Sequence, residues 1–297
     1  MRPLTLLAGL LVLAAPPAAK ALQIGQDLNA TAAPAPASLN HLYVVVDAET
    51  FAAIRDSAKL ARLLGRTDGG LPDYAPPAPD ADRVFFRGRE TYLEIFAPEN
   101  RFGEPVGKVG LALGHDDPAA FETLEMAWRE ACPAGLRRTL VAYQRATPPV
   151  PWYDGVQCDE TAGGDYLAVW AMVYLPQFHA WQTGTTAEGA RTARADILTS
   201  RAADGQGRFD ITRVSLQVEP EIFERLSVQL SRAGLDRHDA TDSVVFTGHG
   251  WALELQASDR PRLEAIELST TTTLAERLPL GSGSVVPLGG ARVRWLP

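Results

Sequence analysis

The sequence lacks several features that would point to common classes of protein. It has only two cysteines and five histidines among 297 residues, and no two histidines have the H-x-x-x-H spacing of a metal site. No G-x-S-x-G nucleophile elbow, phosphate-binding loop or dinucleotide-binding glycine motif occurs. Basic residues are outnumbered, 28 against 36 acidic ones, so nucleic acid is not an expected partner. The remaining composition, 46% hydrophobic, is that of a globular protein with one or two domains.

Residues 1–21 have the pattern of an export signal. Arg2 provides a positive start, residues 4–15 form an apolar run, and Ala19-Lys20-Ala21 forms an A-x-A cleavage site. The apolar run is short for a membrane span. We therefore expect an exported protein, periplasmic or secreted, that begins near Leu22 and has no stable membrane insertion after signal cleavage.

The mature chain would begin with a tether. Residues 22–38 are rich in Ala, Pro, Gln and Asn and have no periodicity, which predicts disorder. Loss of Arg2 and Lys20 with the signal would take the net charge from −8 to −10. In an exported chain Cys132 and Cys158 could form a disulfide, and two buried free thiols are the alternative.

Four segments repeat the order of strand, helix and closing hairpin. They suggest two halves, residues 39–183 and 208–297, joined by a linker at 184–207. The fourth segment is shortened, and its helix is expected at residues 274–278. A helix can cover only one face of the sheet in each segment, so we predict an α+β protein in which paired segments curl into half-open cups with helices outside.

Three stretches resemble a known superfamily. They are Asn40-His41 in the first strand, the GRETYLE sequence at residues 88–94, and residues 106–114 in the second opening strand. They resemble the glyoxalase-like, vicinal oxygen chelate superfamily and are similar to an uncharacterised bacterial glyoxalase-like family of the DUF5829 type. The resemblance covers residues 39–176 and extends to 211–297 through the internal repeat. It implies repeated βαβββ modules whose cups hold a divalent metal through one His or Glu of the first strand and one Glu of the last strand of each module.

The resemblance implies an incomplete metal site. His41 and Glu94 match the ligand positions of the first module, but Lys108 and Val173 stand where the second module should supply ligands. An ammonium group cannot ligate a hard cation, and valine has no donor atom. We therefore expect no cofactor and no metal, and if a divalent metal does bind, His41 and Glu94 are its ligands.

Strand alternation indicates which side chains share a face. His41 and Tyr43 share one face, as do Tyr92 and Glu94. On the second opening strand Lys108 and the small residues share a face that would leave room for a ligand. The predicted ligand-binding residues are His41, Tyr43, Tyr92, Glu94, Lys108 and Gly110.

Several interpretations of this cup stay open. We expect binding of a small organic ligand, with catalysis unproven. The alternatives are metal-dependent or acid/base catalysis by His41 and Glu94 of the lyase, isomerase or dioxygenase type, or a structural or protein-interaction module in which Lys108 neutralises Glu94. Aromatic residues of the second module could line a pocket or pack in the core: Trp152, Tyr153, Trp170, Tyr174 and Trp181. The sequence does not set the oligomeric state.

Charged residues elsewhere have simpler predicted roles. Arg87, next to the first hairpin turn, is expected on a solvated charged loop. Arg213, Glu254 and Arg294 lie near the corresponding positions of the third and fourth segments. Their opposite charges predict a charge-compensated polar interior without metal.

Overall fold

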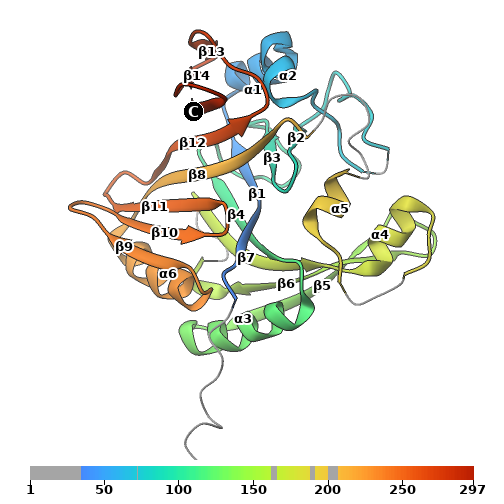
Figure 1. Ribbon diagram of the computed structural model, residues 1–297, viewed down its shortest axis with the longest axis vertical. Coiled ribbons are helices and arrows are strands. Elements are labelled where there is room, and N and C mark those ends of the chain that lie inside the picture. Colours follow the sequence, from blue (N-terminus) through green and yellow to red (C-terminus); the bar gives the residue numbers. More distant parts are fainter. Residues whose placement is uncertain (1–34, 72, 162–165, 188–190, 200–206) are drawn as a thin grey trace, which may run out of the picture. The chain divides into compact units, whose positions relative to one another are not determined.

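The structure is a computed structural model that describes residues 35–71, 73–161, 166–187, 191–199 and 207–297 (Figure 1). The expected export signal and most of the expected tether lie outside the described residues. The predicted disorder is wrong for the last tether residues, because Ala37 is buried and donates a backbone hydrogen bond to Ala233, and Ser38 begins the first strand. A search of the described helices finds none with the length and apolar character needed to cross a bilayer.

The first two modules form one seven-stranded sheet with the order β2-β3-β1-β4-β7-β6-β5. The first strand of each module pairs in parallel with its last strand, β1 with β3 and β4 with β7, and the two modules join through antiparallel β1 and β4. The strands are β1 (Ser38–Val45), β2 (Arg83–Arg87), β3 (Tyr92–Phe96), β4 (Val109–His115), β5 (Leu136–Tyr143), β6 (Val150–Cys158) and β7 (Leu167–Tyr174).

The third and fourth modules form an eight-stranded sheet with the order β13-β14-β15-β12-β8-β11-β10-β9. Here β8 pairs in parallel with β11, and antiparallel β8 and β12 join the modules. The strands are β8 (Phe209–Val218), β9 (Asp236–Asp239), β10 (Val244–Gly248), β11 (Trp251–Ala257), β12 (Arg262–Thr270), β13 (Leu278–Leu280), β14 (Gly283–Pro287) and β15 (Arg292–Leu296).

The fourth module differs from the other three in having no helix. The helix expected at residues 274–278 is wrong, because residues 271–277 form bends and irregular chain that lead into β13. A parallel strand pair needs a long crossover, usually helical, to bring the chain back. Without that crossover the last strand arrives in the opposite direction, and β12 pairs antiparallel with β15.

Most of the described helices pack on the apolar core side of the sheets. The helices are α1 (Ala48–Asp56), α2 (Ala58–Leu64), α3 (Pro118–Ala131), α4 (Pro176–Thr183), α5 (Arg194–Thr199) and α6 (Pro220–Arg232), and a 3-10 turn spans Asp159–Thr161. Of these, α1, α2, α3 and α6 pack on the core side, whereas α4 and α5 pack at the cup of the first sheet. Asp47 and Asp117 cap α1 and α3 by accepting hydrogen bonds from backbone N–H groups of the first turn. Figure 1 shows α3 and α6 side by side, where Trp128 Nε1 donates to the Gln229 carbonyl at 2.9 Å.

One hydrophobic core joins the two sheets. Leu42 and Val44 of β1 belong to the same buried cluster as Val214 and Leu216 of β8 and Trp128 of α3. Burying these apolar side chains removes them from water and leaves the opposite face of each sheet as a cup. The prediction of an α+β protein with repeated modules, half-open cups and helices outside is confirmed, with α4 and α5 as the two helices that contribute to a cup.

Cys132 and Cys158 form a disulfide that links the end of α3 to the end of β6, with Cα atoms 5.5 Å apart. Of the two alternatives for these cysteines, the structure has the disulfide.

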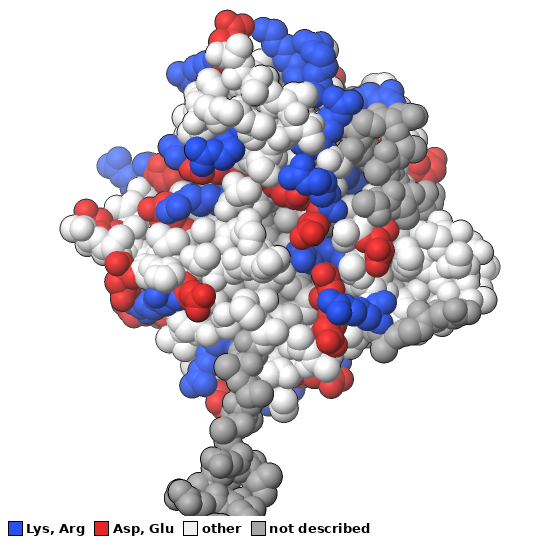
Figure 2. All heavy atoms as spheres, in the orientation of Figure 1, with Lys and Arg blue, Asp and Glu red and all other residues white. Residues whose placement is uncertain are grey.

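The surface carries charges of both signs. On the face shown in Figure 2, basic and acidic side chains are interspersed and neither sign forms a continuous field. The absence of a nucleic-acid partner stays a prediction.

Candidate functional site: an aromatic cavity in the first cup

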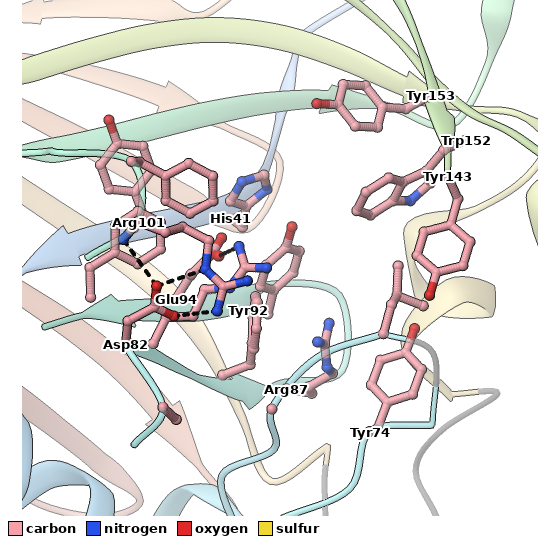
Figure 3. A pocket seen from close by; sticks show the side chains of 18 of the residues that line it. His41, Tyr74, Asp82, Arg87, Tyr92, Glu94, Arg101, Tyr143, Trp152 and Tyr153 are labelled. Carbon is pink, nitrogen blue, oxygen red and sulfur yellow. Dashed lines mark hydrogen bonds and ion pairs between the residues drawn. The ribbon is translucent and has the colours of Figure 1, made fainter. Parts of the chain in front are cut away.

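The cup of the first sheet contains a cavity of about 710 Å³. Its position follows from alternation along β1, because Leu42 and Val44 point into the core whereas His41 and Tyr43 line the cavity. Tyr92 and Glu94 line it from the neighbouring strand β3. Figure 3 shows His41 of β1, Tyr92 and Glu94 of β3 and Arg87 of β2 around this cavity.

Aromatic residues are the largest group in the wall of the cavity, and charged residues are the next largest. Tyr43 stacks on Phe96 with ring centroids 5.0 Å apart, and Trp152 stacks on Phe178 at 5.2 Å. Both interpretations of the aromatic residues of the second module apply, because the rings pack on one another and also face the cavity: Trp152, Tyr153, Trp170 and Tyr174 line it, and Trp181 packs on Tyr143 behind it. Such a wall offers a large apolar contact area to a flat molecule.

His41 is held as a neutral ring. It is 6% exposed, stacks on Tyr92 at 4.3 Å and meets the edge of Trp170 at 5.2 Å. Burial, together with the positive charge of Arg87, lowers the pKa of His41 to about 3. Its Nδ1 atom lies 2.8 Å from Oδ1 of Asn40. At neutral pH His41 can therefore accept or donate one hydrogen bond but carries no charge.

Glu94 is poised between its two protonation states. Its Oε1 atom accepts a hydrogen bond of 3.1 Å from Nη1 of Arg83 in an ion pair. Burial raises the pKa of Glu94 to about 7, against the lowering effect of Arg83 and Arg87. Near neutral pH this carboxyl group can give or take a proton, which is the property required of an acid or base catalyst.

Lys108 and Gly110 do not line the cavity. The predicted neutralisation of Glu94 by Lys108 is wrong, because Lys108 pairs with Glu104, four residues away along the chain. The space above Gly110 is filled by the ring of Tyr43, so closely that a Cβ atom at this position would overlap its carbons. The other side chains that were predicted for the site, those of His41, Tyr43, Tyr92 and Glu94, do line the cavity.

The sequence did not reveal that Arg87 is part of the cavity wall. Arg87 is 7% exposed and makes a bidentate ion pair with Asp68, Nε–Oδ2 2.9 Å and Nη2–Oδ1 3.1 Å. Its guanidinium also lies 4.6 Å from the centroid of the Tyr74 ring and 4.7 Å from that of Phe85. The expected solvated position is wrong. Alternation along β2 was the available signal, since residues 83, 85 and 87 share the face that Glu94 uses.

The donor set does not fit a metal ion. The described part of the chain contains no group of three or more His, Cys, Asp or Glu side chains placed to hold one. Nδ1 of His41 is taken by Asn40, and Glu94 is paired with Arg83. Val173 lies in the hydrophobic core, and its cavity-facing neighbours Met172 and Tyr174 supply no carboxylate. Even open zinc sites usually keep three protein ligands.

The second cup contains a smaller and more polar cavity of about 350 Å³. Nη2 of Arg213 lies 3.1 Å from Oε2 of Glu254, and Arg294 pairs with Glu267. These opposite charges line the cavity together. The interior is charge-compensated in the way that the sequence predicted for Arg213, Glu254 and Arg294.

Fold and site together define an α+β protein of paired strand-rich modules with one aromatic cavity and one charge-compensated cup. The chain belongs to the Family of unknown function (DUF5829), whose model matches residues 39–296. A comparison with curated proteins found no match.

Solved structures with a similar fold have very different sequences. A hypothetical protein from Staphylococcus aureus has 9% identity and a TM-score of 0.52, over 86% of this chain and 97% of that one. An extradiol ring-cleaving dioxygenase from B. fuscum has 12% identity and a TM-score of 0.46, over 90% and 74%. The 2,2',3-trihydroxybiphenyl 1,2-dioxygenase of Sphingomonas wittichii strain RW1 has 10% identity and a TM-score of 0.40, over 75% and 68%. At such identities the Staphylococcus aureus likeness shows the fold alone, and the two dioxygenases are more distant still.

Proposed function

We propose that this protein is a member of the vicinal oxygen chelate superfamily whose first cup binds a small organic ligand with a flat ring. The observation that carries the proposal is the cavity of about 710 Å³ walled by stacked aromatic side chains. Its volume lies in the range of ligand pockets. Its wall combines aromatic rings with charged side chains such as Arg83, Arg87 and Glu94, which could bind polar groups on the ring of the ligand. His41 and Glu94 line the cavity from the adjacent strands β1 and β3.

The aromatic side chains of the wall are packed on one another without a ligand. Trp170 contacts the rings of both His41 and Tyr43, and Phe178 stacks on Trp152. Rings that are already packed lose little conformational freedom on binding, which favours affinity. The Arg87–Asp68 pair is likewise fixed by two hydrogen bonds and by stacking on aromatic rings.

A thermal-shift screen of ring-containing small molecules against the mature protein tests this proposal. The decisive variant is Ala81→Trp, which places a bulky side chain at the cavity, where Ala81 forms part of the lining. The matched control is Ala240→Trp at an exposed position between β9 and β10. We expect stabilising hits whose effect is lost in Ala81→Trp and kept in Ala240→Trp. Hits that survive in Ala81→Trp would place binding outside the first cup.

Metal-dependent chemistry of the vicinal oxygen chelate type is the second candidate. It is favoured by one observation, that His41 and Glu94 line the same cavity from the adjacent strands β1 and β3. The poor donor set argues against it. Expression with added Zn, Ni, Mn or Fe and metal analysis separate the two candidates, and less than about one tenth of an equivalent of metal would end the second. Retention of metal in both His41→Ala and Glu94→Ala would show that its ligands lie elsewhere.

Export is also part of the proposal. The Cys132–Cys158 disulfide supports it, because disulfides persist in oxidising compartments and are rare in the cytosol. Cell fractionation and N-terminal sequencing test it, with a mature start near Leu22 as the expected result. A cytosolic chain that keeps Met1 and has free thiols would contradict export.

A further inference from the structure

A chain of hydrogen bonds fixes the orientation of His41 behind the cavity wall. The hydroxyl group of Tyr174 donates to Oδ1 of Asn40 at 3.4 Å and also hydrogen-bonds Tyr92. The same Asn40 oxygen lies 2.8 Å from Nδ1 of His41. Asn40 is 1% exposed, so this chain is sealed from water on the side away from the cavity.

The chain determines which ring nitrogen of His41 carries the proton. A carbonyl oxygen can only accept, so Nδ1 of His41 must be the donor to Asn40. The ring is 6% exposed, and within the described residues no carboxylate hydrogen-bonds it that could hold a second proton, so the one N–H of the imidazole is the one that faces Asn40. Nε2 therefore keeps a lone pair. It has no hydrogen-bond partner within the described residues, and His41 lines the cavity.

We infer that the ligand of the first cup carries a hydroxyl or N–H group on or beside its ring, and that His41 Nε2 accepts a hydrogen bond from it. Asn40 acts as a positioning residue that holds the tautomer. The inference rests on the proposed function and narrows it to donor-bearing ring compounds. A ligand with only acceptor groups would leave the lone pair of His41 without a partner, which costs affinity.

Nitrogen NMR of the His41 ring tests the first half of the inference without any ligand. The expected result at neutral pH is a protonated Nδ1 and an unprotonated Nε2. In Asn40→Ala the acceptor of Nδ1 is lost, so the spectrum should show a mixture of the two tautomers. Asn40→Asp keeps an acceptor oxygen and should retain the protonated Nδ1. A protonated Nε2 in the wild-type chain would overturn the inference.

Indole and 1-methylindole test the second half, since they share a ring and differ in one N–H donor. Titration should show indole binding about ten-fold more tightly to the wild-type protein. The difference should vanish in His41→Phe, which keeps a ring to stack on Tyr92. It should persist in the control His238→Phe, on exposed β9. Equal binding of both compounds in the cavity would overturn the donor claim and leave the proposed ligand-binding function intact. If neither compound binds, the inference that the ligand is a ring compound with a hydrogen-bond donor is overturned. The thermal-shift screen then tests separately whether the first cup binds any ring-containing ligand.

Discussion

The two cups place a glutamate at the same strand position and stabilise it differently. Glu94 faces Tyr43 of β1 in register, and Glu254 faces Ser215 of β8. Burial opposes ionisation of both. For Glu254 the hydrogen bond from Ser215 and the ion pair with Arg213 outweigh burial and lower the pKa. For Glu94 burial prevails, and the pKa rises to about 7.

The difference follows mainly from burial, because the side chain of Glu94 is 11% exposed and that of Glu254 is 33% exposed, although each glutamate pairs with one arginine. Arg213 of β8 reaches the glutamate of its own cup, whereas the corresponding His41 of β1 is neutral and bonds to Asn40. The cation for Glu94 comes instead from Arg83, where the second cup has Ser243. A single fold thus supports one cup filled with matched charges and another that keeps an aromatic cavity.

The largest expected effect on stability comes from the buried Arg87–Asp68 ion pair of the first cup, whereas the ion pairs described for the second cup are partly exposed. Asp68→Ala should lower the free energy of unfolding by about 3–5 kcal/mol, because it leaves the guanidinium of Arg87 buried without a carboxylate. Urea denaturation of the mature protein measures this. A loss of less than about 1 kcal/mol would show that the Arg87–Asp68 pair behaves like a surface pair.

The next effect concerns the pH dependence of stability. The folded protein favours protonated Glu94, whose pKa rises from 4.5 to about 7, so the contribution of Glu94 to stability falls as pH rises through this window, by up to about 3 kcal/mol. Glu94→Gln removes this fall. The free energy of unfolding of the variant relative to wild type should therefore increase from pH 4.5 to pH 7.5. Parallel curves for the two proteins would contradict a raised pKa.

Exchange of the strand residues should convert one cup toward the other. His41→Arg introduces the cation that Arg213 provides in the second cup and should weaken ligand binding at least about ten-fold, since a guanidinium beside Glu94 fills the cavity and needs hydration. Calorimetry with a hit from the screen measures the change. Arg213→His is the matched control and should leave ligand affinity unaltered. Equal losses in both variants would contradict the separation of the two cups.

The smallest effect is expected in the second cup. Arg213→Met breaks an ion pair whose side chains are 35% and 33% exposed, so the free energy of unfolding should fall by no more than about 1 kcal/mol. Denaturation under the same conditions as for Asp68→Ala makes the comparison direct. A loss as large as that of Asp68→Ala would mean that water does not hydrate the carboxylate of Glu254 once Arg213 is removed.

Much of the fold could be predicted because its signals are local. Alternating apolar residues, helical spacing and the internal repeat indicated most strands of both sheets and the helices that pack on them. In the fourth module the predicted helix was wrong. A helix of five residues at 274–278 is too short for periodicity to distinguish it from a bend, and the missing crossover reversed the pairing of β15.

Site residues could be predicted where strand alternation sets the direction of the side chain. They could not be predicted where the position of a side chain depends on a partner from another segment. Alternation placed His41, Tyr43, Tyr92 and Glu94 on the cavity face. The burial of Arg87 depends on Asp68, which approaches β2 from a Pro- and Gly-rich loop with no periodicity of its own. Lys108 was assigned to Glu94 because both lie near the cup, whereas its partner Glu104 is local in sequence.

The most direct test of an aromatic binding site in the first cup uses the tryptophan indole N–H signals as built-in reporters. Trp152 and Trp170 line the cavity, whereas Trp128 and Trp295 are buried in the core away from it. Addition of a screened ring-containing ligand to nitrogen-labelled protein should shift the signals of Trp152 and Trp170 and leave those of Trp128 and Trp295 in place. Shifts confined to Trp128 or Trp295, or saturating binding that moves neither Trp152 nor Trp170, would contradict the account.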